Sequence, residues 1–274
     1  MDVKIDFYED PVSVLDKAGE FLASQPVSHN LILSILQSRV AQPEPGRYWV
    51  AMERDRAVGV VLQSPLSFAA TLTPMDRQVA TAMVDAIAEM DVALPGVNGE
   101  AATAAAFAGY WSERRKSGAT PFQGNRLFEF LEEGETTFIK GKLRRAVPND
   151  RNLMIDWTLG FQAEIGEPAD GNELRVDRGL AAGEFWVWDD GEAQSMAVGR
   201  MPVGGVVRVS GVYTPPEKRK RGFAAACVDA LSRRMRDAGF RCALYTDLAN
   251  PTSNSIYRRI GYRAVEEVLR YRFE

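Results

Sequence analysis

Residues 184–216, EFWVWDDGEAQSMAVGRMPVGGVVRVSGVYTPP, constrain the fold more than any other segment. They contain three apolar runs, which are separated by Asp189-Asp190-Gly191 and by Gly204-Gly205. Asp-Gly and Gly-Gly pairs between apolar runs are typical of the tight turns of β-hairpins. The segment therefore predicts a three-stranded antiparallel meander.

The segments around the meander predict the rest of a sheet and its helices. Residues 141–147 alternate like a strand, and residues 148–166 predict a turn and a helix. After the meander, apolar residues at helical spacing predict a helix over 223–238 that stops at Gly239. A strand over 241–248, a helix that starts at Asn250-Pro251 and a final strand over 265–273 follow. This order predicts an α/β (or α+β) class with a mixed, mostly antiparallel sheet flanked by helices.

The first half of the chain weakly repeats this order. Residues 47–65 resemble residues 184–202 in having an aromatic-rich strand, a charged turn and a strand of small residues. The order predicts a duplication, with a boundary in the polar segment 132–141 and domains at 1–140 and 141–274. The remaining elements predicted there are helices over 76–90 and 101–118 and strands within 92–100 and 125–133.

Composition excludes several classes of protein. Two cysteines and one histidine in 274 residues offer neither a disulfide framework nor a Cys/His zinc cluster, so we expect no metal site. No uninterrupted apolar run reaches the ~18 residues of a membrane span. The acidic N-terminus lacks the pattern of a signal peptide, which predicts a cytoplasmic protein. The net charge of −4 argues against nucleic-acid binding and slightly favours a cationic substrate.

A basic loop interrupts this acidic chain where a helix begins. Residues 218–221 read Lys-Arg-Lys-Arg, and Gly222 follows. Cations are unfavourable at a helix N-terminus unless an anion completes the site. Gly222 lets the backbone approach a ligand, and successive N–H groups at a helix start form a nest for phosphate. The loop therefore predicts binding of a diphosphate, although it matches neither a Walker A motif nor a Rossmann fingerprint.

Two motifs resemble the GNAT superfamily of acyl-CoA-dependent N-acetyltransferases. After a strand that ends in V-Y-T-P-P, residues 219–224 read R-K-R-G-F-A and resemble the family's pyrophosphate loop, [R/Q]-x-x-G-x-[G/A]. Residues 250–263, NPTSNSIYRRIGYR, resemble its Asn…Tyr helix and the strand that follows it. The resemblance covers residues 142–274, and the first half is similar to the degenerate N-terminal repeat of tandem members. It implies two tandem GNAT-like domains.

The resemblance also implies a co-substrate and a set of site residues. Acetyl-CoA would bind where two neighbouring strands separate. Asn254 would contact the pantetheine or the thioester, with support of its helix start as the alternative. Tyr257 would be the general acid, with a packed helix aromatic as the less favoured alternative. The pantetheine would contact Val212, Tyr213 and Thr214, and the diphosphate would contact a loop of Arg219, Lys220, Arg221, Gly222, Phe223, Ala224 and Ala225.

The general base is the point at which the chain departs from the family pattern. The strand at 205–216 contains no acidic residue, so Asp247 after the next strand is the predicted base, with Glu184, Asp189 and Glu274 as weaker alternatives. Cys227 and Cys242 lie in a helix and a strand pattern and are not expected to be nucleophiles.

The predicted function is transfer of an acetyl group from acetyl-CoA to a primary amine by direct attack in a ternary complex. The alternative is a non-catalytic acyl-CoA-binding or regulatory protein, which the missing base motivates. The expected partners are acetyl-CoA and an amine acceptor, and both a monomer and a homodimer remain open. In the first half, His29 is expected at a helix start or on the surface.

Overall fold

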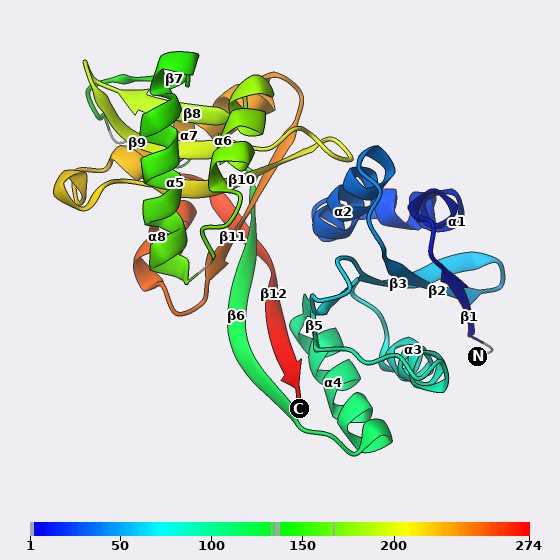
Figure 1. Cartoon of the computed structure of the whole chain (residues 1–274). Helices are drawn as coiled ribbons and strands as arrows, with labels where there is room; N and C mark the ends of the chain where they lie inside the picture. The colour runs from blue at the N-terminus through cyan, green and yellow to red at the C-terminus, as the bar shows by residue number, and fades with distance from the viewer. Residues whose placement is uncertain (1–2, 133, 135–137, 167) are drawn as a thin grey trace. The chain divides into compact units, whose positions relative to one another are not determined.

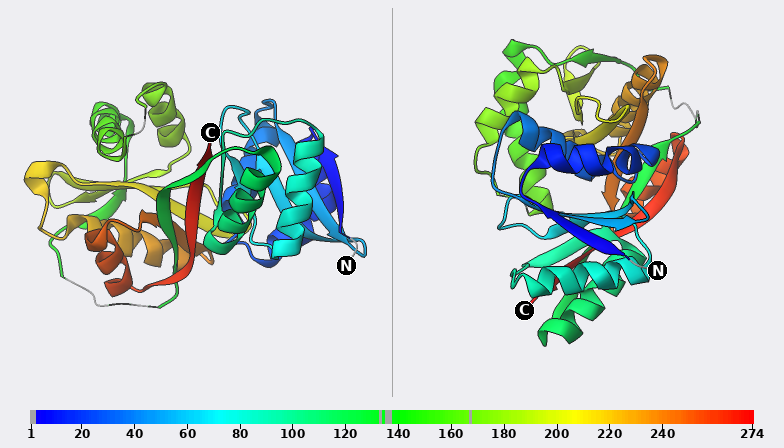
Figure 2. Two further views of the ribbon diagram at one scale, coloured as in Figure 1. Left: turned by 90° about the horizontal axis from the view of Figure 1, so that it is seen from below. Right: turned by 90° about the vertical axis from the view of Figure 1, so that its right-hand side faces the viewer.

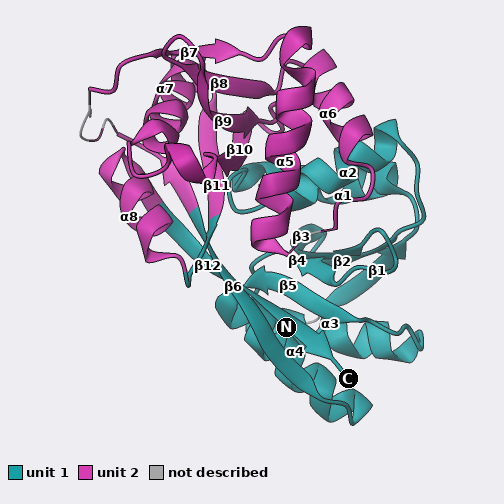
Figure 3. Ribbon diagram, turned by 60° about the vertical axis from the view of Figure 1, so that its left-hand side comes forward, with its two compact units in different colours: residues 1–127, 246–249, 264–274 teal, residues 128–245, 250–263 magenta. Residues whose placement is uncertain are grey.

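The computed structural model describes residues 3–132, 134, 138–166 and 168–274 (Figure 1). The chain forms two compact units (Figure 3). Unit 1 contains Met1–Leu127, Thr246–Ala249 and Ala264–Glu274, and unit 2 contains Phe128–Tyr245 and Asn250–Arg263. The predicted domains 1–140 and 141–274 stay a prediction, because they concern a duplication along the sequence, whereas the units concern packing.

The same order of helices and strands occurs twice along the chain. The first series is β1 Lys4–Tyr8, α1 Pro11–Ser24, α2 Asn30–Ala41, β2 Arg47–Glu53, β3 Arg56–Gln63, β4 Ala70–Leu72, α3 Arg77–Glu89, β5 Gly96–Glu100, α4 Ala101–Arg115 and β6 Ala119–Phe130. The second is β7 Lys142–Arg145, α5 Arg151–Ile165, α6 Asn172–Ala181, β8 Phe185–Asp189, β9 Ala193–Gly199, β10 Val206–Tyr213, α7 Phe223–Asp237, β11 Arg241–Asp247, α8 Pro251–Arg259 and β12 Tyr262–Phe273. Two short 3-10 turns, η1 Pro148–Asp150 and η2 Pro216–Lys218, occur only in the second series.

Unit 1 is built on the strand order β1-β2-β3-β4-β5. Its strands are antiparallel except for the parallel pair β4 and β5. Helices α1 and α2 cover one face, and α3 and α4 cover the other (Figure 2, right). Burial of large side chains such as Trp49, Phe107 and Trp111 forms the core under α3 and α4, because sheet faces and helix stripes are stable only when they cover each other.

Unit 2 repeats this design with the order β11-β10-β9-β8-β7. The pairs from β7 to β10 are antiparallel, and β10 and β11 are parallel. Helices α5 and α6 lie on one face and α7 and α8 on the other (Figure 2, left). One core forms under α7 and a second, which includes Met154 and Trp157 of α5, on the opposite face. The predicted fold class, a mixed and mostly antiparallel sheet flanked by helices, is confirmed.

Local sequence signals account for most of these elements. The predicted meander is β8-β9-β10, and the turns contain Gly191, Gly204 and Gly205 at positive φ. Helix α8 begins as predicted, since the Asn250 side chain accepts a hydrogen bond from Ser253 N at 3.0 Å. His29 precedes α2, also as predicted. The sequence did not predict β1, α1 or β4. None of the helices that the structure describes is long and apolar enough to cross a membrane.

The C-terminal part of β12 is a strand of unit 1. It pairs antiparallel with β5 from Val268–Glu100 to Arg272–Gly96. The approach is close at Gly96, where an added Cβ would overlap the carbonyl oxygen of Tyr271. The pairing of β5 with β12, which are far apart in the sequence, therefore depends on the absence of a side chain at Gly96.

Replacing Gly96 by alanine tests this pairing. The new methyl group would push β12 away from β5, so we expect the free energy of unfolding to fall by about 1–3 kcal/mol in urea titrations. Gly109 of α4 is exposed and has open space at its Cβ position, so Gly109→Ala should raise stability by up to about 1 kcal/mol. Equal stability of Gly96→Ala and the wild type would contradict the close approach.

Arg144 of β7 ties three segments of unit 2 together. Its guanidinium group donates to both carboxylate oxygens of Asp150, at 2.6 and 3.1 Å, and to Asp189 at 2.6 Å. All three side chains are less than a third exposed. The hydrogen bonds from Arg144 hold the pKa of both carboxyl groups below the ordinary value.

This network predicts a dependence of stability on pH. A lowered folded-state pKa contributes stability above the ordinary carboxyl pKa of about 3.9, and that stability is lost as pH falls through the folded-state value. We expect Arg144→Met to cost about 1.5–3 kcal/mol at pH 7 and the difference from wild type to shrink below about pH 4. Arg151→Met, which removes a more exposed pair with Asp177, should have a much smaller effect. A difference that persists unchanged at pH 2 would refute the role of the two carboxylates.

Candidate functional site

The pairing of β10 with β11 ends before either strand ends. The last paired residues are Val209 and Leu244, whereas β10 continues to Tyr213 and β11 to Asp247. The two strands therefore separate toward their C-terminal ends. An extended ligand that enters between separated strands can use the backbone groups that each strand no longer gives to the other.

β10 also leaves its regular pairing with β9 on the other side. The register shifts between Ser210 and Tyr213, and Gly211 has a φ of 54°, which glycine adopts readily. A bulge of this kind leaves a residue outside the ladder. Among the described residues, Gly211 and Val212 thus have no register partner on either side of β10.

The loop after β10 has an unusual backbone. Lys220 has a φ of 60° and Gly222 a φ of 85°, so two left-handed residues flank Arg221. Left-handed backbone is unfavourable for a lysine. The first helical hydrogen bond of α7 is donated by Ala226 to Gly222, which leaves the amides of residues 223–225 ahead of the ladder. The alternation of left-handed residues with a helix N-terminus forms a concave array of N–H groups suited to an anion.

The four basic residues of the loop divide into two pairs. Lys218 donates to Glu192 at 3.1 Å and to the carbonyl of Ala193 at 2.7 Å. Arg219 donates to the Thr214 carbonyl at 2.8 Å, contacts Glu164 of α5 and lies over the Tyr213 ring. These two side chains bind other parts of unit 2 and hold the loop in place.

Lys220 and Arg221 differ from this first pair. Both residues are exposed, and the Arg221 guanidinium lies 4.7 Å from the centre of the Phe223 ring. Both belong to the segment whose amides precede α7. They are therefore the two positive charges placed to meet an anion at the helix start.

Ser195 of β9 supports the end of β10, and the sequence did not predict this. Its hydroxyl donates to the carbonyl of Tyr213 at 2.9 Å and accepts from the Thr214 hydroxyl at 2.9 Å. Tyr213 itself is buried against Trp157. The carbonyls of Tyr213 and Thr214 thus already accept hydrogen bonds within unit 2. In the sequence, nothing around a serine within an apolar strand indicates that it makes these hydrogen bonds.

Tyr257 and Asn254 lie on α8, and both have structural contacts. Tyr257 is half-buried against Phe128 and Tyr262, with ring centres 6.4 and 5.9 Å away. Burial raises the pKa of Tyr257 to about 12, so its hydroxyl stays protonated at neutral pH. Asn254 is buried, and its Nδ2 donates to the Asn250 carbonyl at 2.7 Å, which is the helix-start role that the sequence left open.

The carboxylates suggested as a base have different surroundings. Asp247 is exposed at the end of β11, within the residues that pack with unit 1, and accepts a hydrogen bond from Ala249 N at 2.7 Å. Glu184 forms an ion pair with Arg200 at 3.0 Å. Asp189 is bound by Arg144, as described above. Glu274 lies at the end of the chain, with Oε1 3.4 Å from the Thr120 hydroxyl. None of the four suggested carboxylates is therefore without a structural contact.

Glu266 of β12 is a titratable group that the sequence did not single out. It belongs to unit 1 and is half-buried. Burial raises its pKa to about 7, against a hydrogen bond from Ser28 that lowers it. Two adjacent glutamates in a strand give no sign of which one is buried.

The cysteines are unsuited to nucleophilic chemistry. Cys227 and Cys242 are free and buried. Burial raises the pKa of each thiol to about 12, so neither forms the reactive thiolate at neutral pH.

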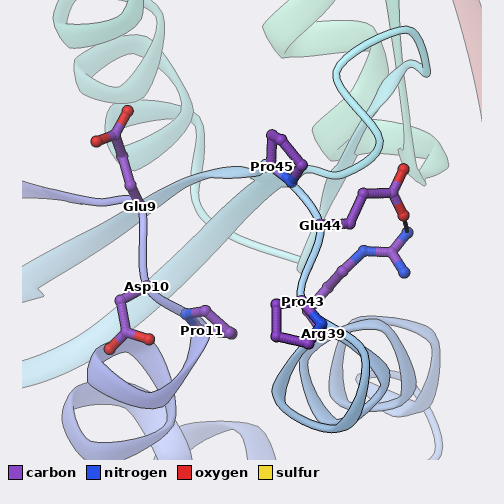
Figure 4. Close-up of a pocket in the computed structure, with 7 residues that line it drawn as sticks. All are labelled: Glu9, Asp10, Pro11, Arg39, Pro43, Glu44 and Pro45. Carbon is purple, nitrogen blue, oxygen red and sulfur yellow. Dashed lines mark ion pairs between the residues drawn. The ribbon is translucent and has the colours of Figure 1, made fainter.

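In a pocket of about 340 Å³ in unit 1, the charged groups of Asp10, Arg39 and Glu44 make structural contacts. Figure 4 shows Arg39 paired with Glu44, at 2.8 Å, and Arg39 also donates to the Ser64 hydroxyl at 2.6 Å. Asp10 caps α1 by accepting from Ser13 N at 2.8 Å. The pocket carries no feature of the anion site of unit 2. Its lining is Glu9, Asp10, Pro11, Arg39, Pro43, Glu44 and Pro45.

Comparison with known proteins agrees with this geometry. The model of the FR47-like protein family matches residues 190–271, a segment that includes both the loop at 219–225 and α8. No curated protein matches the sequence of the chain.

Several solved structures share the fold over nearly the whole chain. A GNAT-family acetyltransferase from Colwellia psychrerythraea has a TM-score of 0.65 at 12% identity and covers 99% of this chain and 100% of its own. A GCN5-related N-acetyltransferase from Sphaerobacter thermophilus has a TM-score of 0.63 at 15% identity, with 98% and 95% covered. A tandem GNAT protein from the clavulanic acid biosynthesis pathway has a TM-score of 0.55 at 9% identity, with 98% of each chain covered. The chain thus has the fold of these GNAT proteins, and residues 190–271 are similar to the FR47-like family.

Proposed function

We propose that residues 141–274 form an acetyl-CoA-binding domain that transfers the acetyl group to a primary amine. The observation that carries this proposal is the array of amides at residues 220–225. It lies directly after a strand that separates from β11 beyond Val209 and bulges away from β9 between Ser210 and Tyr213. A diphosphate fits the first feature and an extended pantetheine arm fits the second.

The backbone and the side chains of the loop have different roles in binding the diphosphate. The amides of Lys220, Gly222 and the first residues of α7 donate to phosphate oxygens, and the exposed side chains of Lys220 and Arg221 add positive charge. Arg219 keeps the loop closed onto Thr214 and Glu164 and thereby fixes the amides. The pantetheine runs along Val212, Tyr213 and Thr214, where Val212 offers the backbone groups that β9 and β11 do not use. Asn254 of α8 contacts the same ligand in this proposal.

The chemistry needs a donor to the carbonyl oxygen, a base and an acid. Acetyl-CoA supplies an activated thioester. Val212 N–H donates to the carbonyl oxygen as negative charge develops there, while the amine nitrogen bonds to the carbonyl carbon and the carbon–sulfur bond breaks. Asp247 takes the proton that the amine loses, and the Tyr257 hydroxyl donates to the departing sulfur. Because an ordinary thiol has a pKa of about 8.5, Tyr257 acts mainly by hydrogen bonding to that sulfur.

Residues 1–140 would form a degenerate GNAT-like domain without a co-substrate site. The strand before α3 is β4, and the helix begins after Asp76. A carboxylate at that position repels phosphate, where unit 2 has Gly222 directly after two basic residues. This contrast favours one acetyl-CoA per chain.

Calorimetric titration with CoA tests the binding site. We expect one CoA per chain for the wild type and at least tenfold weaker binding for Gly222→Ala, because alanine at a φ of 85° is strained and its Cβ would lie 3.0 Å from Ile139. Gly239→Ala is the matched control, since Gly239 has a φ of 86° at the other end of α7 with open space around it. Two equivalent sites, or equal affinity in Gly222→Ala, would overturn the assignment.

Thiol release from acetyl-CoA over a panel of amines tests catalysis. Removing the Tyr257 hydroxyl in Tyr257→Phe should lower kcat about 100-fold, with CoA affinity retained. A Tyr257 pKa of about 12 also predicts no loss of activity from its ionisation up to about pH 11.

A non-catalytic acyl-CoA-binding protein is the second candidate. Glu184 and Asp189 are held by arginines, and Asp247 is exposed, so none of these three candidates is a buried base free of an arginine. CoA binding without thiol release on any amine would select this candidate.

A further inference from the structure

Arg208 lies in β10 on the face opposite α7. Its neighbours Val207 and Val209 belong to the apolar core under α7. Side chains alternate between the faces of a strand, so Arg208 lies on the face that α5 and α6 cover. It pairs with Ala243 of β11, one position before the two strands separate. Arg208 is therefore next to the point where the proposed pantetheine channel begins.

One nitrogen of the Arg208 guanidinium is buried without a partner. Nη1 is shielded from solvent and has no hydrogen-bond partner among the described residues. Burial is the main influence on the pKa of Arg208 and lowers it. The charges that act on it come from Tyr245 on β11, from Arg200 and from Glu184.

Glu184 does not neutralise Arg208. Its carboxylate forms an ion pair with Arg200 at 3.0 Å and accepts a hydrogen bond from Met201 N at 3.1 Å. Two arginines thus share one carboxylate, and that carboxylate is bound to Arg200. Buried arginines are normally paired, because an unpaired buried charge costs several kcal/mol.

An anionic ligand would remove this imbalance. A guanidinium group has planar donors that match a carboxylate in a two-point contact. Four residues separate Arg208 from Val212, about 13 Å in an extended strand. The long arginine side chain and a small acceptor together span that distance, so a carboxylate on Arg208 leaves the amine of the same molecule directed toward Val212 N–H.

We infer that Arg208 binds the carboxylate of the acceptor, and that the acceptor is an amino acid or a similar small amino-carboxylate. This inference rests on the proposed acetyl transfer and specifies its substrate class. It reverses the expectation of a cationic acceptor, which followed from the net charge of −4, because one half-buried arginine with a shielded nitrogen at the site outweighs charges spread over the surface.

Matched acceptors test the inference by thiol release from acetyl-CoA. The pairs are glycine with glycinamide, leucine with leucinamide and phenylalanine with phenylalaninamide. For at least one pair, we expect the wild type to prefer the acid by about 10- to 100-fold in kcat/KM. The amides have the more acidic ammonium groups and more free amine at neutral pH, so chemistry alone would favour them. Arg208→Met should abolish the preference through KM of the acid, and Arg208→Lys should restore part of it.

Measurements of Tm distinguish an arginine that binds a ligand from one that stabilises the fold. Without acceptor, Arg208→Met should have an equal or higher Tm than the wild type, because the substitution removes an unpaired buried charge. With CoA present, amino acids should raise the Tm of the wild type more than their amides do, and Arg208→Met should lose this difference. This second readout does not depend on turnover.

Arg241 provides the control. It is bound by both oxygens of Glu129, at 2.6 and 2.9 Å, so Arg241→Met should lose stability and keep the preference for acids. Equal use of acids and amides by the wild type, or an Arg208→Met variant that loses stability and keeps the preference, would overturn the inference while leaving acetyl transfer intact. Thiol release on no amine, with an acid-specific Tm shift, would defeat acetyl transfer and leave the role of Arg208 standing. Absence of both thiol release and an acid-specific Tm shift would overturn the inference.

Discussion

The end of β10 does not keep the regular register that a strand inside a sheet has on both sides. Pairing with β11 stops at Val209, and a bulge at Gly211 breaks the register with β9. Backbone N–H and C=O groups need partners, and in the proposed function a pantetheine arm supplies them here. Arg208 before the separation and the loop at 219–225 after it then lie at the two ends of one path.

The basic cluster has a physical explanation in an acidic chain. Lys218 and Arg219 bind carboxylates and carbonyls of unit 2, and this fixes a loop whose backbone is left-handed at Lys220 and Gly222. Lys220 and Arg221 add charge at the start of α7. The unfavourable interaction of cations with a helix N-terminus is offset once an anion binds between them, so the loop is built for its ligand.

The two halves of the chain share one order of helices and strands. They differ in the residues at the start of the helix that follows the central strand. Both series lead from a central strand into a helix, but Asp76 precedes α3 where Gly222 precedes α7. Unit 1 also includes the C-terminal part of β12, so neither unit is a continuous piece of chain. Substitution of a few residues at one helix start is sufficient to remove an anion site while the fold is kept.

The sequence by itself determined the local structure and the anion loop. Asp-Gly and Gly-Gly turns, the spacing along α7, the cap at Asn250 and the R-K-R-G-F-A loop are short-range signals, and each acts within a few residues. Only the tertiary structure decided the pairing of β12 with β5, the contacts of Ser195 and Arg219, and the unpartnered Nη1 of Arg208. These depend on strand register and on which face is buried, because a buried charge and an exposed one have the same sequence and differ only in what the rest of the chain places around them.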